Sequence, residues 1–151
     1  MTDTPKYRLH HSLAYHLSLA ARIQERRLDE MLRPLGLTRI TWCILLAVEN
    51  EGLARPSAIA GFVGIDRTAT SRALRQMEAA GLLARSAANG DRRMTEVALT
   101  ACGKDLVRRG TPLAVENNRL ISDKLSPEEE ACLQRLLGRV IAGEERALDK
   151  L

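Results

Sequence analysis

The segment from Arg55 to Thr100 constrains the fold of this chain more than any other. Its first half has apolar residues at helical spacing in two short stretches separated by Gly64. Its second half has short alternating stretches, at 83–87 and 94–99, on either side of Asn89-Gly90. Asn-Gly tolerates positive φ and favours a tight hairpin turn. The segment therefore predicts two helices joined by a turn and followed by a β-hairpin.

Apolar periodicity predicts two helices ahead of this segment. Leucine and alanine recur at helical spacing from about Leu9 to Leu35, and Arg33-Pro34 with Gly36 marks the end of that pattern. Thr38 is positioned to cap a second helix, which stops near Asn50-Glu51-Gly52. We therefore expect a long amphipathic helix followed by a shorter one.

Two short periodic stretches define the helix pair inside the segment. Residues 56–63 predict a short helix, and residues 66–80 predict a second helix that ends at Gly81. The buried side of the first is expected to consist of Ile59, Phe62 and Val63. The buried side of the second is expected to include Thr70, Leu74 and Met77. This order, with a glycine in the turn, is typical of a helix-turn-helix.

Two further helices are predicted after the hairpin. Thr100 and Gly103 begin the first, and Pro112 lies inside it, so we expect a kink where proline removes a hydrogen bond and clashes with the preceding turn. Ser126-Pro127-Glu128-Glu129 begins the last helix, because it combines a Ser N-cap, Pro at the first position and a capping-box Glu. The predicted fold class is mainly α with a small β-hairpin.

Positive charge is concentrated in the middle of the chain. Residues 55–109 hold 10 basic and 5 acidic side chains, a net charge of +5, whereas residues 126–151 hold 4 basic and 6 acidic, a net charge of −2. Affinity for duplex DNA rises with each phosphate that a cation neutralises. The distribution favours a nucleic-acid partner, although a solvated basic face would carry the same charge.

The second helix of the pair is the candidate for the major groove, since in a helix-turn-helix that helix contacts base edges. Small hydroxyl and methyl groups near its start permit close approach to bases, and arginines bind guanine or phosphate. Ser57 and the free amides at the start of the preceding helix are candidates for holding a phosphate. The candidate DNA contacts on the second helix are Arg67, Thr68, Ala69, Ser71, Arg72 and Arg75.

The tip of the hairpin is the second candidate DNA contact. Arg92 and Arg93 lie on a narrow ribbon suited to a minor groove, whose negative potential attracts guanidinium groups. Asp91 would face phosphate, so we expect its carboxylate to orient one of the two arginines through a charge-assisted hydrogen bond. Each motif alone is common in other proteins, and the ordered combination is what favours DNA binding.

This combination of motifs resembles the MarR family of winged helix-turn-helix transcription regulators. Residues 57–66 are similar to the family's first motif helix, residues 71–83 to its recognition helix, and Asp91-Arg92-Arg93 to its wing. Residues 125–129 match the start of its last helix, and the resemblance covers nearly the whole chain. It implies a homodimeric, sequence-specific DNA-binding regulator, most often a repressor. The family's Asp-x-Arg wing pattern matches Asp91 and Arg93 here, and Arg92 is an additional contact.

The outer helices predict pairing of two chains. Their apolar faces exceed what a winged-helix core of about 80 residues covers, and a two-fold dimer would set two recognition helices one helical turn of DNA apart, over a palindromic operator. The resemblance implies the same arrangement. We expect a single domain, 1–151, with a DNA-binding lobe at 36–103 and dimerisation helices at 5–35 and 104–151. A monomer with these helices folded over the lobe is the alternative.

The resemblance also implies control by a small aromatic or anionic ligand bound between the lobe and the dimerisation helices, or by oxidation of a cysteine. Tyr15, His16 and Trp42 are the candidates for a ligand pocket, while Trp42 also suits a core position. The peroxide-sensing branch of the family carries a reactive cysteine in the first helix, and this chain has none before Cys43. We interpret Cys43 as a small buried residue and not as a switch.

Other functional classes have little support in the sequence. An enzyme is not predicted, because the sequence has no Gly-rich phosphate loop, nucleophile elbow or clustered His, Asp and Glu. The three histidines lack metal-site spacing, the three cysteines predict free thiols, and we expect no cofactor. No apolar run approaches the roughly 20 residues that cross a bilayer, so we expect a cytoplasmic protein. The alternative function is a winged-helix module that binds protein or RNA without an effector.

Overall fold

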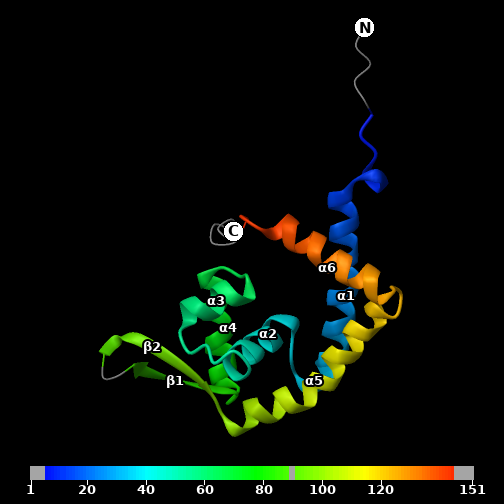
Figure 1. Ribbon diagram of the computed structural model, residues 1–151. Coiled ribbons are helices and arrows are strands. Elements are labelled where there is room, and N and C mark those ends of the chain that lie inside the picture. The colour runs from blue at the N-terminus through cyan, green and yellow to red at the C-terminus, as the bar shows by residue number, and fades with distance from the viewer. Residues whose placement is uncertain (1–5, 89–90, 145–151) are drawn as a thin grey trace.

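The computed structural model describes residues 6–88 and 91–144, with residues 91–93 described by their backbone alone (Figure 1). It is mainly helical with one two-stranded antiparallel sheet, which confirms the predicted fold class. The main elements are α1 (Leu13–Leu32), α2 (Arg39–Glu49), α3 (Pro56–Val63), α4 (Arg67–Ala79), β1 (Leu83–Ala88), β2 (Asp91–Leu99), α5 (Ala101–Ser122) and α6 (Pro127–Ile141). Two 3₁₀ turns, η1 (Leu9–His11) and η2 (Arg33–Leu35), flank α1.

Side-chain caps set the starts of the helices. Thr38, Asp66, Thr100 and Ser126 each accept a hydrogen bond from the third following backbone amide, and the helices begin there as predicted. The first helix begins later than predicted, at Leu13. Ser12 has extended backbone geometry and its hydroxyl accepts the Tyr15 amide, so the preceding residues form the separate turn η1.

The helix pair, α2 and the hairpin, which we call the lobe, form most of one hydrophobic core. Leu28 and Leu32 of α1 and Leu106 and Val107 of α5 belong to the same core. Ile44 and Leu45 of α2 have no exposed surface and lie among residues from every other element of the lobe. The positions Thr70, Leu74 and Met77 of α4 are buried as predicted. The core of the lobe is therefore covered by contacts made inside one chain.

Phe62 is an exception to the predicted core, because 55% of it is exposed. Helix α3 spans only two turns and buries Ile59 and Ala60, with Val63 half-buried between them on the helix surface. At about 100° per residue, Ile59, Val63 and Ala60 form one buried stripe along the helix, and Phe62 lies beyond the edge of that stripe. The prediction that Phe62 fills the core was therefore wrong.

The hairpin is longer on its second strand than predicted. β2 begins at Asp91 instead of Met94, and Ala88 pairs with Asp91 across an irregularity in the register. The Val97 amide donates to the Ala54 carbonyl at 2.8 Å and ties the base of β2 to the segment before α3. The predicted turn residues Asn89 and Gly90 lie outside the described residues.

Two glycines of α5 lie where this helix meets the lobe. A Cβ atom on Gly103 would stand 2.1 Å from the Leu82 carbonyl oxygen, and one on Gly110 would stand 2.4 Å from the Trp42 ring. Both positions therefore require glycine for close packing. Beyond them α5 continues through Pro112 as one helix, and Figure 1 shows it bowed without a break.

We call α1, α6 and the second half of α5 the arm, which gathers on one side of the lobe (Figure 1). None of the described residues of α6 is buried, and Val140 and Ile141 are 53% and 58% exposed. Leu13 and Ile23 of α1 and Val115 of α5 are more than half exposed as well. The arm thus leaves apolar surface uncovered in a single chain.

Within the part of the chain that the structure describes, no single helix has the length and apolarity to cross a membrane.

Candidate nucleic-acid interface

Helix α4 is held so that one of its faces is buried and the other is open to solvent. The Asp66 carboxylate accepts the Ala69 amide at 2.7 Å, and the buried Thr70 hydroxyl donates to the Asp66 carbonyl at 2.8 Å. Leu74 and Met77 anchor the helix in the lobe core. These contacts fix the start and the rotation of α4 and thereby decide which side chains face outward.

Four of the six candidate DNA contacts on α4 are open to solvent. Arg67, Thr68, Arg72 and Arg75 are exposed, and Ala69 and Ser71 are half-buried. Arg75 donates from Nη1 to the Ser71 hydroxyl at 3.3 Å, one turn earlier on the same face. Gln76 is exposed beside them and was not among the predicted contacts. The face combines guanidinium, hydroxyl and amide groups, which are the groups that bind base edges and phosphates.

Ser57 lies close to the start of α4. Pro56, Ser57, Arg67 and Thr70 line a recess of about 240 Å³ between the beginnings of α3 and α4. Ser57 is exposed, and Pro56 occupies the first turn of α3, where it leaves no orphan amide of its own. The structure thus brings Ser57 and Arg67, which come from different helices, to one recess.

The backbone of the wing residues Asp91, Arg92 and Arg93 forms the start of β2. Their side chains, and with them the expected bond between Asp91 and an arginine, lie outside the described residues. The minor-groove contact by the wing therefore stays a prediction.

An ion pair between α4 and β1 was not predicted from the sequence. Arg85 donates to Glu78 Oε2 from Nε at 2.8 Å and from Nη2 at 2.5 Å, and its backbone amide donates to Oε1 at 3.3 Å. These hydrogen bonds from Arg85 lower the pKa of the Glu78 carboxyl and keep it ionised. Glu78 lies in a helix and Arg85 in a strand, on either side of Gly81, so the period of neither element relates them and periodicity offered no signal for the pair.

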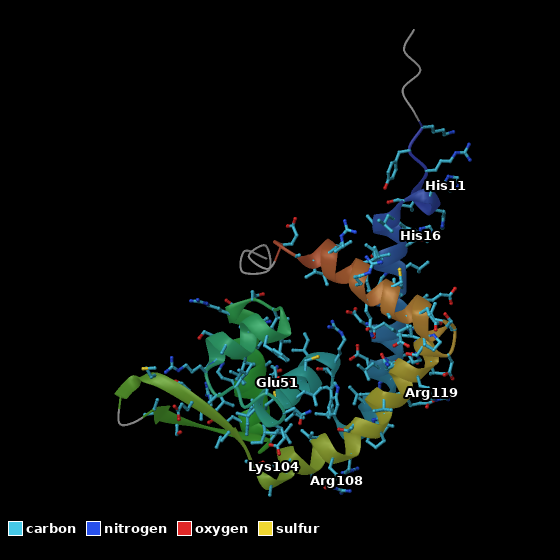
Figure 2. The ribbon with its side chains drawn as sticks, viewed as in Figure 1. His11, His16, Glu51, Lys104, Arg108 and Arg119 are labelled. Atoms are coloured by element: carbon cyan, nitrogen blue, oxygen red, sulfur yellow. The ribbon has the colours of Figure 1, made fainter. Side chains whose placement is uncertain are left out.

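The three candidate ligand residues do not form one described cluster. Trp42 is 3% exposed and packs against Gly110, as its alternative core role predicted. Tyr15 contacts His10 edge to face, with ring centroids 4.9 Å apart. Figure 2 shows His16 toward the N-terminal end of α1, far along that helix from α2. A ligand contact by any of the three remains a prediction.

A cavity of about 560 Å³ opens in the arm instead. Leu17, Ala20 and Ile23 of α1 face Leu133 and Leu137 of α6 across it, and the other lining residues include Gln24, Arg27 and Lys124. Arg27 donates from Nε to the buried Asn117 side chain at 2.8 Å and so joins α1 to α5. The cavity is largely apolar with two cations in its wall.

The three cysteines are free thiols that differ in exposure. Burial raises the pKa of Cys43, while Cys102 and Cys132 are exposed. A raised pKa lowers the thiolate fraction and with it the reactivity of Cys43. Among the described residues, no group of three His, Cys, Asp or Glu side chains is arranged to bind a metal ion.

Several known proteins are similar to this chain in sequence and in fold. Residues 35–94 match the model of a family described as MarR family. The HTH-type transcriptional regulator PecS of Dickeya dadantii is 33% identical over 127 residues, which cover 82% of this chain and 76% of PecS. Sco3205, a MarR family transcriptional regulator from Streptomyces coelicolor in complex with DNA, is 26% identical with a TM-score of 0.79 and coverage of 94% and 92%. BpsR of Bordetella bronchiseptica, whose DNA binding is regulated by 6-hydroxynicotinic acid, has a TM-score of 0.85 at 22% identity and coverage of 92% and 99%.

Proposed function

The chain belongs to the MarR family, and on this premise we propose that it is a homodimeric, sequence-specific DNA-binding transcription regulator. Its action is that of a repressor that a small-molecule ligand releases from a palindromic operator, in the cytoplasm and without a cofactor. The observation that carries the proposal is the outward face of α4, with Arg67, Thr68, Arg72 and Arg75 exposed above a closed core. A helix presented in this way fits the major groove.

A second copy of the chain would cover the arm. The exposed apolar residues of α1 and α6 lie next to the open cavity, and a monomer gains nothing by exposing them. A two-fold axis through the arm would also place two copies of α4 on one face of the duplex. We therefore propose that the lobe at 36–103 binds DNA and that 5–35 and 104–151 form the dimer.

Binding to a selected duplex tests the DNA-binding role. A duplex enriched from a random pool by the wild-type protein should bind more weakly when Arg92→Ala and Arg93→Ala are combined. The salt slope should fall by about one unit for each phosphate that the variant no longer neutralises. Changes at Thr68, Ser71 or Arg72 should instead alter base preference, by roughly 1–3 kcal/mol for each well-formed hydrogen-bonded pair with a base that is removed.

The control for these variants is Arg119→Ala. Arg119 of α5 pairs with Glu116 of the same helix and with Asp123, which follows its end, and it lies on the far side of the molecule from the hairpin (Figure 2). The Arg119→Ala substitution removes one positive charge and changes neither α4 nor the hairpin, so the affinity for the duplex should change little. Unchanged binding by the double wing variant would refute the wing contact. Enrichment of RNA in place of duplex DNA would support the alternative winged-helix module.

Light scattering tests the dimer. The wild-type chain should have the mass of two copies at micromolar concentration, and Leu136→Asp should shift it to one copy, because Leu136 lies on the apolar face of α6. Ala131→Asp adds the same charge to the opposite side of that helix and should keep the dimer. A monomeric wild-type chain would overturn the proposal.

The effector is proposed to be a small aromatic or anionic molecule, with Tyr15, His16 and Trp42 as the candidate residues. The regulation of BpsR by 6-hydroxynicotinic acid supports this class. Titration of 6-hydroxynicotinic acid and other small aromatic acids should release the selected duplex and change the fluorescence of Trp42, the one tryptophan in the chain. Tyr15→Ala should raise the concentration required. If no aromatic acid releases the duplex, this part of the proposal fails.

A further inference from the structure

The recognition helix and the wing are joined by a side-chain contact near the base of the hairpin. Glu78 lies in the last turn of α4, and Arg85 is the third residue of β1. One carboxylate accepts three hydrogen bonds from Arg85, two from the guanidinium and one from the backbone amide. Arginine in such a multiple contact is oriented as well as attracted, because its planar donors fix the geometry.

Other contacts fix only the root of the hairpin. The Leu82 amide donates to the Met77 carbonyl at 2.9 Å, and the Thr100 hydroxyl donates to the Gly81 carbonyl at 2.6 Å. Both bonds precede or follow the strands. Inside β2, the Val97 amide, which is opposite Arg85 in the register, donates to the Ala54 carbonyl at 2.8 Å and holds the hairpin up to that level. Toward the tip, an isolated two-stranded ribbon has little rigidity of its own.

Beyond Arg85 the hairpin stands away from α4. Glu78 and Arg85 line one side of an open recess of about 310 Å³, and Ser86, Ala87 and Thr95 line the rest. These three residues are exposed. Among the described residues, the ion pair is therefore the outermost hydrogen-bonded contact between the hairpin and the recognition helix.

We propose that Glu78 and Arg85 are positioning residues that hold the wing at a fixed angle to α4, so that the wing and the recognition helix enter neighbouring grooves of the same duplex together. The inference rests on the proposed function and adds a role to residues that need not touch DNA. Loss of the pair leaves α4 in place, because Leu74 and Met77 still anchor it. The Val97 bond to Ala54 still holds the base of β2, so the part of the hairpin beyond Arg85 is freed.

A direct phosphate contact by Arg85 would predict different behaviour. In that case Glu78 would only reduce the positive charge available to DNA, and Glu78→Gln would leave binding unchanged or strengthen it. The positioning role predicts the opposite, since Glu78→Gln removes the negative charge and replaces one of the two carboxylate oxygens that accept from Arg85 with an NH2 donor. The two explanations therefore differ in the sign of one substitution.

The experiment compares Glu78→Gln, Arg85→Met and the exchanged pair Glu78→Arg with Arg85→Glu on the duplex selected by the wild-type protein. Methylation of guanine N7 reports the major groove under α4, and hydroxyl-radical cleavage reports the minor groove under the wing. Both single variants should keep the major-groove protection and lose the minor-groove protection. The exchanged pair should recover it, and Arg119→Met should retain both patterns.

Each outcome separates this inference from the proposed function. Failure of the wild-type protein to protect any duplex would remove the proposed function itself. If Glu78→Gln protects both grooves as the wild-type protein does, the positioning role is wrong. It is also wrong if the exchanged pair lacks minor-groove protection although its melting temperature equals that of the wild type. If the exchanged pair fails to fold, Glu78→Gln alone decides the question.

Discussion

The lobe and the arm are built from similar amphipathic helices but cover their apolar faces differently. In the lobe, Ile44, Leu45 and Ile59 have no exposed surface, whereas Leu133, Leu136 and Val140 of α6 are 41%, 43% and 53% exposed. A face that is covered within one chain contributes to folding directly, while an uncovered face contributes only when a partner binds it. The difference indicates that the core of the lobe, to which Leu28 and Leu32 of α1 also belong, is complete within one chain, and that α6 depends on the proposed second copy.

The largest expected effect is in the lobe core. Ile44→Ala should lower the free energy of unfolding by about 2–5 kcal/mol, because it leaves a cavity at a position with no exposed surface. Phe62→Ala in the same lobe should change it by no more than about 0.5 kcal/mol, since Phe62 is mainly exposed. Urea denaturation measures both, and equal losses would contradict the division between core and surface in the lobe.

The junction between lobe and arm should be the next most sensitive site. Gly103→Ala places a methyl group against the Leu82 carbonyl and should cost about 1–3 kcal/mol. Gly61→Ala in α3 meets no atom within 4 Å and should stabilise the chain by roughly 0.5–1 kcal/mol. Thermal melting of the two alanine variants distinguishes them. A Gly103→Ala protein as stable as the wild type would show that α5 can shift away from the lobe at little cost.

Helix caps provide a smaller and more direct comparison. Thr100 caps α5 and also donates to the Gly81 carbonyl, so Thr100→Ala should lose about 1–2 kcal/mol. Ser126 caps α6 in the arm, where Ser126→Ala should lose about 0.5–1 kcal/mol. Urea denaturation of both variants at one protein concentration tests the order. A larger loss at Ser126 would indicate that the arm contributes more stability than its single-chain burial suggests.

The smallest effect concerns chemistry and not stability. Because burial raises the pKa of Cys43, iodoacetamide should modify Cys102 and Cys132 first, and Cys43 should need a higher pH to react. Peptide mass spectrometry over a series of pH values follows the three thiols separately. Loss of duplex binding after mild peroxide treatment, abolished by Cys43→Ser, would instead make Cys43 a switch.

The sequence by itself determined the elements and the inward face of α4. Thr38, Asp66, Thr100 and Ser126 mark helix starts because a cap acts on amides only three residues away, and that signal is local. The buried positions of α4 followed from the 3.6-residue period in the same way. The start of α1 was missed because the cap Ser12 lies inside an apolar pattern that continues on both sides.

Only the tertiary structure decided how the elements meet. Phe62 is exposed because the position of α3 against its neighbours selects a buried stripe that excludes it. The role of Gly103 depends on the Leu82 carbonyl, which lies in the turn between α4 and β1. The Glu78 to Arg85 pair exists because the chain turns at Gly81 and brings β1 back beside α4. Such contacts join residues that no single period relates, so their geometry is set by packing between elements and not by the sequence within any one of them.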